Sequence, residues 1–195
     1  MRLFVALDIT DDIRSRIQRF IEGVSGFAPD ARWVSPESLH LTLKFIGEKS
    51  EASAENIKQA LSKVKSEPLE IAFRGHGFFP GPKHARIFWI GVDAGPELAA
   101  VASAVDQALV PLSVPTENHA FSPHITLARV SPSGASKHYK GESSNQGFDL
   151  LQKKLAAFSI PEFGTMTARE FFLYESRPSS SGGPQYIKLS RFELA

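Results

Sequence analysis

A short pattern, Ser-x-His-apolar-Thr-Leu, occurs twice in this sequence of 195 residues, once in each half of the chain. The first copy spans residues 38–43 and the second residues 122–127. Side chains alternate between the two faces of a β-strand, so each copy places its histidine and threonine on one face and its apolar residues on the other. The repeat predicts two related strands, each with a histidine on a polar face.

Strand and helix patterns alternate along the rest of the chain. Besides the strand of the second motif, runs rich in β-branched and aromatic residues predict strands at residues 2–8, 32–34, 37–46, 69–79, 85–92, 165–175 and 185–194. Apolar residues at helical spacing predict helices that begin after Thr10 and Ser50, at Pro96 and near Phe148. Several strand pairs are joined by turns too short for a parallel crossover, which predicts an α+β fold with mainly antiparallel sheets and helices on one face. Because each half holds one His-x-Thr strand, we expect residues 1–195 to form a single domain of two similar lobes.

The composition excludes several classes of function. The formal net charge of +1 is too balanced for bulk wrapping of nucleic acid, so any contact with RNA or DNA should be small. The sequence contains no cysteine, which excludes disulfides, thiolate zinc sites and cysteine nucleophiles. The apolar run at the N-terminus is too short for a secretory signal, and no run approaches the length of a membrane span. We therefore expect a cytoplasmic protein that does not contact a membrane.

Two histidines on facing strands can act as one acid and one base in a single turnover, because imidazole titrates near neutrality. Hydrolysis of a cyclic phosphodiester uses such a pair. A neutral imidazole takes a proton from the attacking water, and a protonated one gives a proton to the departing ribose oxygen. A threonine two residues further along the same strand face can donate a hydrogen bond to the phosphoryl oxygens. This scheme needs no metal.

Each motif alone also has a simpler interpretation. A single histidine on a strand is usually a hydrogen-bonded structural residue. Paired histidines can bind zinc, but a catalytic zinc normally takes three protein ligands, and neither motif has a further acidic residue or histidine at ligand spacing. Lys83 and His84, in the turn before a predicted strand, could meet a phosphate, although a solvated turn is the simpler interpretation.

Two polar regions are interpreted as solvent-exposed surface. Arg14, Arg16 and Arg19 lie on the polar face of the first predicted helix, and we expect that face to be solvated. Residues 131–147 are rich in Ser, Gly and Lys, which predicts a polar surface loop whose lysines could alternatively reach an RNA strand.

Four segments of the chain resemble one known family. They are Arg-Leu-Phe-Val-Ala-Leu at residues 2–7, Trp33 with the first motif at 38–47, Arg-Ile-Phe-Trp-Ile-Gly-Val at 86–92, and the second motif at 121–129. Together they resemble the two-histidine (2H) phosphoesterase superfamily, and specifically the RNA 2′,3′-cyclic phosphodiesterases, historically called 2′-5′ RNA ligases (LigT-like). The resemblance covers nearly the whole chain and is far more specific than either motif alone.

The resemblance implies a fold and a reaction. The fold would be bilobal with pseudo-twofold symmetry, with two mainly antiparallel sheets facing a central cleft and helices on the outer faces. The reaction would be hydrolysis of an RNA terminal 2′,3′-cyclic phosphate to a 2′-phosphomonoester, without a metal or other cofactor. The partners would be RNA ends or small cyclic nucleotides, and the protein would be a monomer that requires no protein partner.

The family's motif also implies roles for five residues of this sequence. His40 would be the proton donor to the leaving 3′ oxygen and His124 the proton acceptor from water, with the reverse assignment left open. Thr42, Thr126 and Arg129 would bind the phosphate. Three other functions remain compatible with the motifs. These are 2′-5′ RNA ligation or cleavage, hydrolysis of another small cyclic nucleotide, and binding of RNA ends without catalysis.

The two motifs differ at one corresponding position, where the second has Arg129 and the first has Phe45. Strict alternation would point Arg129 away from the cleft, so a strand end or a β-bulge would have to redirect it toward the phosphate. For Phe45, packing in the core is favoured over contact with a nucleobase.

Overall fold

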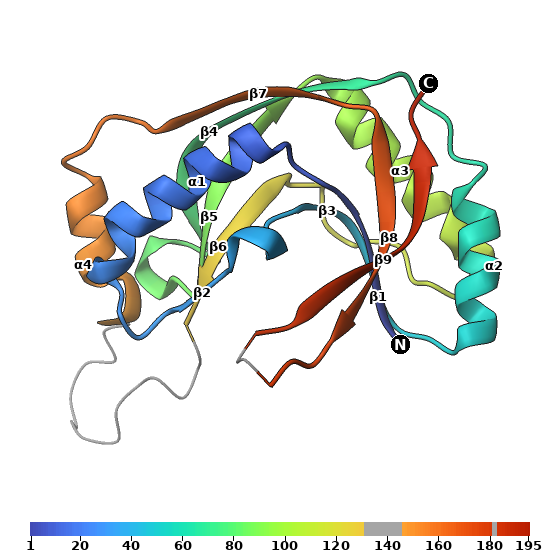
Figure 1. Ribbon diagram of the computed structural model, residues 1–195, viewed down its shortest axis with the longest axis horizontal. Coiled ribbons are helices and arrows are strands. Elements are labelled where there is room, and N and C mark those ends of the chain that lie inside the picture. The colour runs from blue at the N-terminus through green and yellow to red at the C-terminus, as the bar shows by residue number, and fades with distance from the viewer. Residues whose placement is uncertain (131–145, 181–182) are drawn as a thin grey trace.

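The computed structural model describes residues 1–130, 146–180 and 183–195. In these ranges the strands form two sheets, and every neighbouring pair of strands is antiparallel (Figure 1). Sheet A, with the order β3-β1-β8-β9, consists of β1 (Arg2–Leu7), β3 (Leu41–Glu48), β8 (Glu170–Arg177) and β9 (Gln185–Glu193). Sheet B, with the order β2-β6-β5-β4-β7, consists of β2 (Arg32–Trp33), β4 (Leu69–Phe79), β5 (Ile87–Ala94), β6 (His124–Arg129) and β7 (Glu162–Ala168).

Helices pack against the outer sides of the two sheets. The longer ones are α1 (Asp11–Val24), α2 (Glu51–Leu61), α3 (Pro96–Leu109) and α4 (Gln146–Leu155). Short 3₁₀ turns are η1 (Ser25–Phe27), η2 (Pro36–Ser38), η3 (Pro82–His84) and η4 (Val110–Leu112). Although α1 follows a strand of sheet A, it packs against β7 of sheet B, and α3 follows a strand of sheet B but packs against β3 of sheet A (Figure 1). The chain therefore passes repeatedly between the lobe built on sheet A and the lobe built on sheet B.

A continuous hydrophobic core runs through both lobes. Val5 and Leu7 of β1 and Phe88 and Ile90 of β5 are fully buried members of the same cluster. Burial of a side chain of this size stabilises a fold by about 1.5–3 kcal/mol. Because the two sheets share this core, we propose that residues 1–195 form a single domain made of two lobes.

The α+β fold with antiparallel sheets is confirmed, and the helices begin close to the predicted residues. Ser50 caps α2, since its Oγ accepts a hydrogen bond from the Ser53 backbone N–H at 3.2 Å. Thr10 occupies the equivalent position before α1, but its side chain makes no capping bond. The first turn of α1 instead carries Asp11 and Asp12, whose charges complement the helix dipole.

Two strand predictions are wrong in their boundaries. The strand predicted at 37–46 begins only at Leu41, because the proline at the start of η2 favours a tight turn there. The strand predicted at 165–175 is in fact two strands, β7 in sheet B and β8 in sheet A, separated at Arg169. Both strands are rich in apolar residues, so the pattern does not reveal that the chain changes sheet between them.

The polar segment predicted at 131–147 falls mostly on residues 131–145, which lie outside the described residues. Its last two residues, Gln146 and Gly147, belong to α4. Among the described residues, no helix is both long and apolar enough to cross a membrane.

Candidate active site

His40 lies immediately before β3, between two buried leucines that anchor the chain on both sides. Its Nδ1 donates a hydrogen bond to the Ser38 carbonyl oxygen at 2.7 Å. Because a carbonyl oxygen can only accept, this bond places a proton on Nδ1 and leaves Nε2 to exchange a proton with a substrate. The imidazole packs against Phe4, with ring centroids 4.9 Å apart, and meets the Tyr186 ring edge-on at 5.0 Å.

His124 is the first residue of β6 in the other lobe, and its surroundings follow the same plan. Its Nδ1 donates to the Ser122 carbonyl oxygen at 2.8 Å, so its Nε2 is also the nitrogen left for a substrate. The ring meets Phe79 edge-on at 4.9 Å and lies 6.2 Å from the Trp89 ring, measured between centroids. Each histidine is therefore oriented by one backbone hydrogen bond and by aromatic rings, two for His124 and three for His40, whose third neighbour is Tyr174 at 6.3 Å.

The two threonines lie two residues beyond the histidines, on the same strand faces. Thr42 pairs with Ala6 of β1, and Thr126 pairs with Trp89 of β5. Both threonines are partly buried, between buried neighbours on the opposite face. Their hydroxyls can donate hydrogen bonds to an anion that reaches the histidine beside them.

A β-bulge interrupts β3 directly after Thr42. Ala6 pairs with Thr42, but the preceding residue of β1 pairs with Lys44, so Leu43 has no partner of its own. Leu43 and Lys44 are both buried, and alternation resumes one residue out of phase. Phe45 thus turns to the face that carries the histidine and threonine, where 60% of its surface is exposed. The expectation that Phe45 packs in the core is wrong, because that expectation assumed unbroken alternation.

The same irregularity occurs in β6, directly after Thr126. Trp89 pairs with Thr126, but the preceding residue of β5 pairs with Ala128, so Leu127 is the additional residue. Leu127 and Ala128 are both buried, and Arg129 is exposed. A strand end or a bulge was expected to be needed for Arg129 to share a face with the histidine, and the structure has the bulge.

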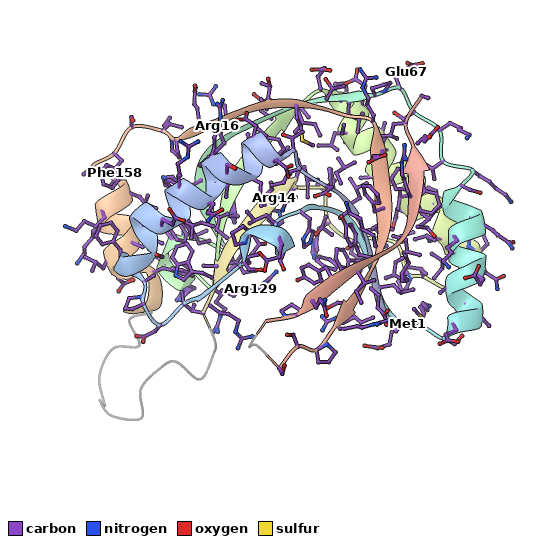
Figure 2. All side chains as sticks on the ribbon, in the orientation of Figure 1. Met1, Arg14, Arg16, Glu67, Arg129 and Phe158 are labelled. Carbon is purple, nitrogen blue, oxygen red and sulfur yellow. The ribbon has the colours of Figure 1, made fainter. Side chains whose placement is uncertain are left out.

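Arg129 lies between the two lobes, and its charge acts on both histidines. Figure 2 shows it at the end of β6, between this strand and the ends of β8 and β9. Burial lowers the pKa of His40 and of His124, and the Arg129 guanidinium lowers the pKa of each further. The hydrogen bonds to the two serine carbonyls oppose this lowering. The Asp8 carboxylate raises the pKa of His40, and the charge of His124 lowers it, so the two imidazoles are close enough to interact.

Arg14 is a residue for which the expectation of a solvated helix face is wrong. Only 18% of its side chain is exposed, and its Nη2 donates to Asp8 Oδ1 at 2.6 Å. Its Nη1 donates to the Pro36 carbonyl oxygen in η2 at 2.5 Å, so the guanidinium fixes the segment that leads into the first histidine (Figure 2). Arg16 and Arg19 are exposed, as expected of a solvated face. No local pattern distinguishes the three arginines, since their difference depends on where the helix docks.

The last strand supplies two site residues that no motif marked, Tyr186 and Lys188. Tyr186 contacts the His40 ring, and Lys188 Nζ lies 2.5 Å from Asp8 Oδ2. Both reach the site because β9 pairs with β8, which pairs with β1. Such pairing between distant segments leaves no signal in a single sequence.

Lys83 and His84 are exposed in η3, which agrees with the solvated turn expected for them. Among the described residues, no group of three or more histidine, cysteine, aspartate or glutamate side chains could hold a metal ion. The groups that the two motif strands contribute to the site are two imidazoles, two hydroxyls and the Arg129 guanidinium. This set can transfer protons to and from a bound anion and hold its negative charge.

A two-lobed fold with one such histidine in each lobe defines a two-histidine phosphoesterase. The family described as LigT like Phosphoesterase matches residues 7–89 of the chain. An RNA 2′,3′-cyclic phosphodiesterase of Archaeoglobus fulgidus is 35% identical over 193 residues, which cover 99% of this chain and 100% of that protein. An RNA 2′,3′-cyclic phosphodiesterase of Methanothermobacter thermautotrophicus is 28% identical over 100% of this chain and 99% of that protein. The chain therefore belongs to the LigT-like phosphoesterase family.

Solved structures confirm the fold. The crystal structure of TT0787 of Thermus thermophilus superposes with a TM-score of 0.77 at 25% identity, covering 100% of this chain and 98% of that chain. The crystal structure of E. coli LigT complexed with 3′-AMP gives a TM-score of 0.76 at 24% identity, covering 99% of this chain and 97% of that chain. The bilobal architecture implied by the paired motifs is thus confirmed.

Proposed function

We propose that this protein hydrolyses the 2′,3′-cyclic phosphate at the end of an RNA to a 2′-phosphomonoester. The observation that carries the proposal is the matched geometry of the two histidines. Each lobe presents one imidazole whose Nδ1 is bonded to a carbonyl oxygen, so both Nε2 atoms are left for proton transfer. The activity named for the relatives from Archaeoglobus fulgidus and Methanothermobacter thermautotrophicus supports the same substrate class.

In the proposed mechanism, the neutral His124 Nε2 takes a proton from a water molecule as the water oxygen attacks phosphorus. The bond from phosphorus to the ribose O3′ breaks, and the protonated His40 gives its Nε2 proton to that oxygen. The products are a free 3′-hydroxyl and a 2′-phosphomonoester. Each histidine ends the reaction in the other's starting protonation state, and exchange with solvent restores both.

The negative charge on the phosphoryl oxygens rises as water attacks. Arg129 is proposed to hold these oxygens with its planar set of N–H donors, and Thr42 and Thr126 to donate one hydrogen bond each. The two bulges support this arrangement, because the one in β6 turns Arg129 to the face of His124 and Thr126.

The assignment of His40 as the acid is supported by one charge near it, that of Asp8. The Asp8 carboxylate raises the pKa of His40, which favours the protonated form that an acid requires. For His124, the effects besides burial are the Ser122 carbonyl, which raises the pKa, and the Arg129 guanidinium, which lowers it. Asp8 is therefore the charge that favours a proton donor at His40, and it acts against burial, Arg129 and His124, which all lower the pKa of His40.

Phe45 is proposed to stack on the terminal nucleobase. Its ring is 60% exposed on the face that carries His40, and its centroid lies 6.3 Å from that of Phe4. A base stacked on an aromatic side chain contributes about 1–3 kcal/mol without selecting one base, so weak sequence preference is expected.

The proposal is tested with an oligonucleotide that ends in a 2′,3′-cyclic phosphate, incubated with the protein in excess chelator. Phosphorus NMR of the product should show a 2′-phosphomonoester and no 3′-phosphomonoester, and the rate should match that without chelator. Absence of turnover with and without added divalent metal would contradict the proposed activity. Turnover only with metal would contradict the metal-independent mechanism.

A further inference from the structure

A pocket of about 480 Å³ opens beside His40, between η2 and the concave face of sheet A. The residues that line it together with His40 are Asp8, Arg14, residues 36–39, Tyr174, Tyr186 and Lys188. Thr42, Phe45 and Arg129 are not among them. The pocket therefore extends from His40 away from the groups proposed to hold the phosphate and the nucleobase.

The order of atoms around ribose determines which part of a substrate would face this pocket. The base is attached to C1′, next to C2′, whereas the chain toward the preceding nucleotide leaves from C4′, next to C3′. The base and the 5′ chain therefore leave the ribose at opposite ends of the C2′–C3′ edge that carries the cyclic phosphate. With O3′ at His40 and the base on Phe45, the 5′ chain passes beyond His40.

The strand register places the pocket on that side of the site. Phe45 pairs with Phe4 near the start of β1, and Leu41 pairs with Leu7 at its end. Asp8, which comes directly after Leu7, is a lining residue of the pocket. The proposed base platform and the pocket thus lie at opposite ends of the stretch that holds the first histidine and threonine.

We propose that this pocket binds the phosphodiester that joins the terminal nucleotide of an RNA to the nucleotide before it, with Lys188 as its cationic ligand. The inference rests on the proposed function, because that function places O3′ at His40. It adds a reason for the site to distinguish an RNA end from a free cyclic mononucleotide, since only the RNA carries this phosphodiester.

Lys188 is the cation in the pocket that can accept a new anionic partner. Its side chain is 46% exposed, and its Nζ lies 2.5 Å from Asp8 Oδ2 and 4.1 Å from the centre of the Phe172 ring. An ammonium group has three N–H donors, so the bond to Asp8 leaves others for a phosphodiester oxygen. Asp8 is shared with Arg14, so its single negative charge does not fully cancel the two cations.

Arg14 is less suited to this role, because its guanidinium is already bonded. It donates to Asp8 and to the carbonyl oxygens of Ile9 and Pro36. Glu37 adds a negative charge at the exposed rim of the pocket. The two cations and the two carboxylates therefore sum to zero, so the diester would be held by the free N–H donors of Lys188 rather than by a net positive charge, and this limits the size of the expected effect.

The test measures kcat/KM on three substrates: a nucleoside 2′,3′-cyclic phosphate with a 5′-hydroxyl, a dinucleotide that ends in the same cyclic phosphate, and that dinucleotide with a neutral methylphosphonate linkage. The wild-type protein should prefer the charged dinucleotide over the other two. In Lys188→Gln this preference should fall by about fivefold to tenfold, as expected for loss of one partly exposed charge-assisted contact. Lys188→Arg should retain most of it.

A matched control is Arg191→Gln, which removes a positive charge from the same strand outside the pocket, where Arg191 pairs with Glu170 and Glu193. It should retain the preference for the charged linkage. If Lys188→Gln retains that preference as well, the pocket does not bind the phosphodiester, although the proposed function stands. The same conclusion follows if Lys188→Gln lowers kcat/KM by the same factor on the charged and the neutral dinucleotide. If the wild-type protein turns over none of the three substrates, the proposed function itself fails.

Discussion

The two motif strands, β3 in sheet A and β6 in sheet B, solve the same geometric problem in the same way. In each, a histidine donates from Nδ1 to the carbonyl oxygen of the serine two residues earlier, at 2.7 Å for His40 and 2.8 Å for His124. In each, a bulge after the threonine reverses the alternation of the side chains. In the proposed mechanism, proton transfer therefore depends on features present in both lobes.

The strands differ in the residues that come after each bulge. On the site face, Phe45 in β3 corresponds to Arg129 in β6, so one strand has an apolar ring where the other has a cation. On the buried face, Lys44 corresponds to Ala128, and Lys44 Nζ forms an ion pair with Asp106 of α3 at 2.6 Å. The difference shows how a repeated motif can supply two matched proton-transfer groups, the histidines. The residues after the bulges, Phe45 and Arg129, give each half a different chemical character. In the proposed function, Phe45 in one half holds the nucleobase and Arg129 in the other holds the phosphate.

The largest expected effect comes from removing either of the two histidines that both strands share. His40→Ala and His124→Ala should each lower kcat on a cyclic phosphate substrate by about 10²–10⁴, because each removes one proton-transfer group. Steady-state kinetics on a fluorescent oligonucleotide with a cyclic phosphate end measures this loss. The exposed His84 provides the control, and His84→Ala should keep the wild-type rate. A variant of either motif histidine with wild-type kcat would contradict the paired mechanism.

Phe45 and Arg129 are the corresponding residues in which the two strands differ. Replacing the charged one, Arg129, should have the next largest effect. Arg129→Met should lower kcat/KM by about 10²–10³, the loss typical of a donor aimed at developing negative charge. Arg129→Lys should recover only part of the activity, because an ammonium group does not reproduce the planar, bidentate donors of a guanidinium. If Arg129→Lys is as active as the wild-type protein, a positive charge is sufficient and the planar arrangement of guanidinium N–H donors is not required.

We expect Arg14 to act as a positioning residue of the first lobe, because its guanidinium is hydrogen-bonded to the segment before His40. Arg14→Gln should lower kcat by about tenfold to a hundredfold with little change in KM, because a displaced imidazole still allows substrate to bind but transfers its proton poorly. Arg16→Gln, from the exposed face of the same helix, serves as the control and should retain kcat. A rise in KM with unchanged kcat in Arg14→Gln would mean that Arg14 contributes to binding instead.

Removing the aromatic ring of Phe45 should have a smaller effect, and it should act on KM rather than on kcat. Phe45→Ala should raise KM by about fivefold to tenfold through loss of stacking, and Phe45→Trp should keep KM near the wild-type value. Phe158 is similarly exposed, at 58%, but does not belong to the site, so Phe158→Ala is the matched control. A large fall in kcat for Phe45→Ala with unchanged KM would show that the ring acts on the reaction step.

The smallest expected effect concerns pH dependence rather than rate. Because one imidazole must be neutral and the other protonated, kcat/KM should follow a bell-shaped curve against pH. Burial and Arg129 lower the pKa of both His40 and His124, so the maximum should fall below the ordinary histidine pKa of about 6.5. In Arg129→Met both pKa values should rise, and the residual activity should peak at a higher pH. A peak displaced to lower pH would contradict the placement of this charge beside both rings.

Much of this arrangement could be predicted from the sequence, because the two motifs are local. The spacing of His40 to Thr42 and of His124 to Thr126 follows from strand periodicity, and the repetition predicted two lobes. The directions of Phe45 and Arg129 could not be predicted, since a bulge depends on how the neighbouring strand pairs rather than on the motif itself.

Other parts of the site depend on contacts between distant segments. Arg14 resembles its neighbours on the helix until α1 docks beside η2, and only then does its guanidinium reach the Pro36 carbonyl oxygen. Tyr186 and Lys188 join the site because β9 pairs with β8, which pairs with β1, and Lys188 forms an ion pair with Asp8, 180 positions away along the chain. These positions are determined by tertiary packing, which leaves no periodic signal in the sequence.

The central claim, that His40 is the acid and His124 the base, is tested most directly by a substrate in which sulfur replaces the ribose O3′ in the cyclic phosphate. A thiolate leaves without needing a proton, so this substrate bypasses the acid but still requires a base to activate water. The defect of His40→Ala should become at least about tenfold smaller on the 3′-thio substrate, while the defect of His124→Ala should be unchanged. Rescue of His124→Ala instead of His40→Ala would reverse the assignment, and rescue of neither would contradict proton donation to the 3′ oxygen.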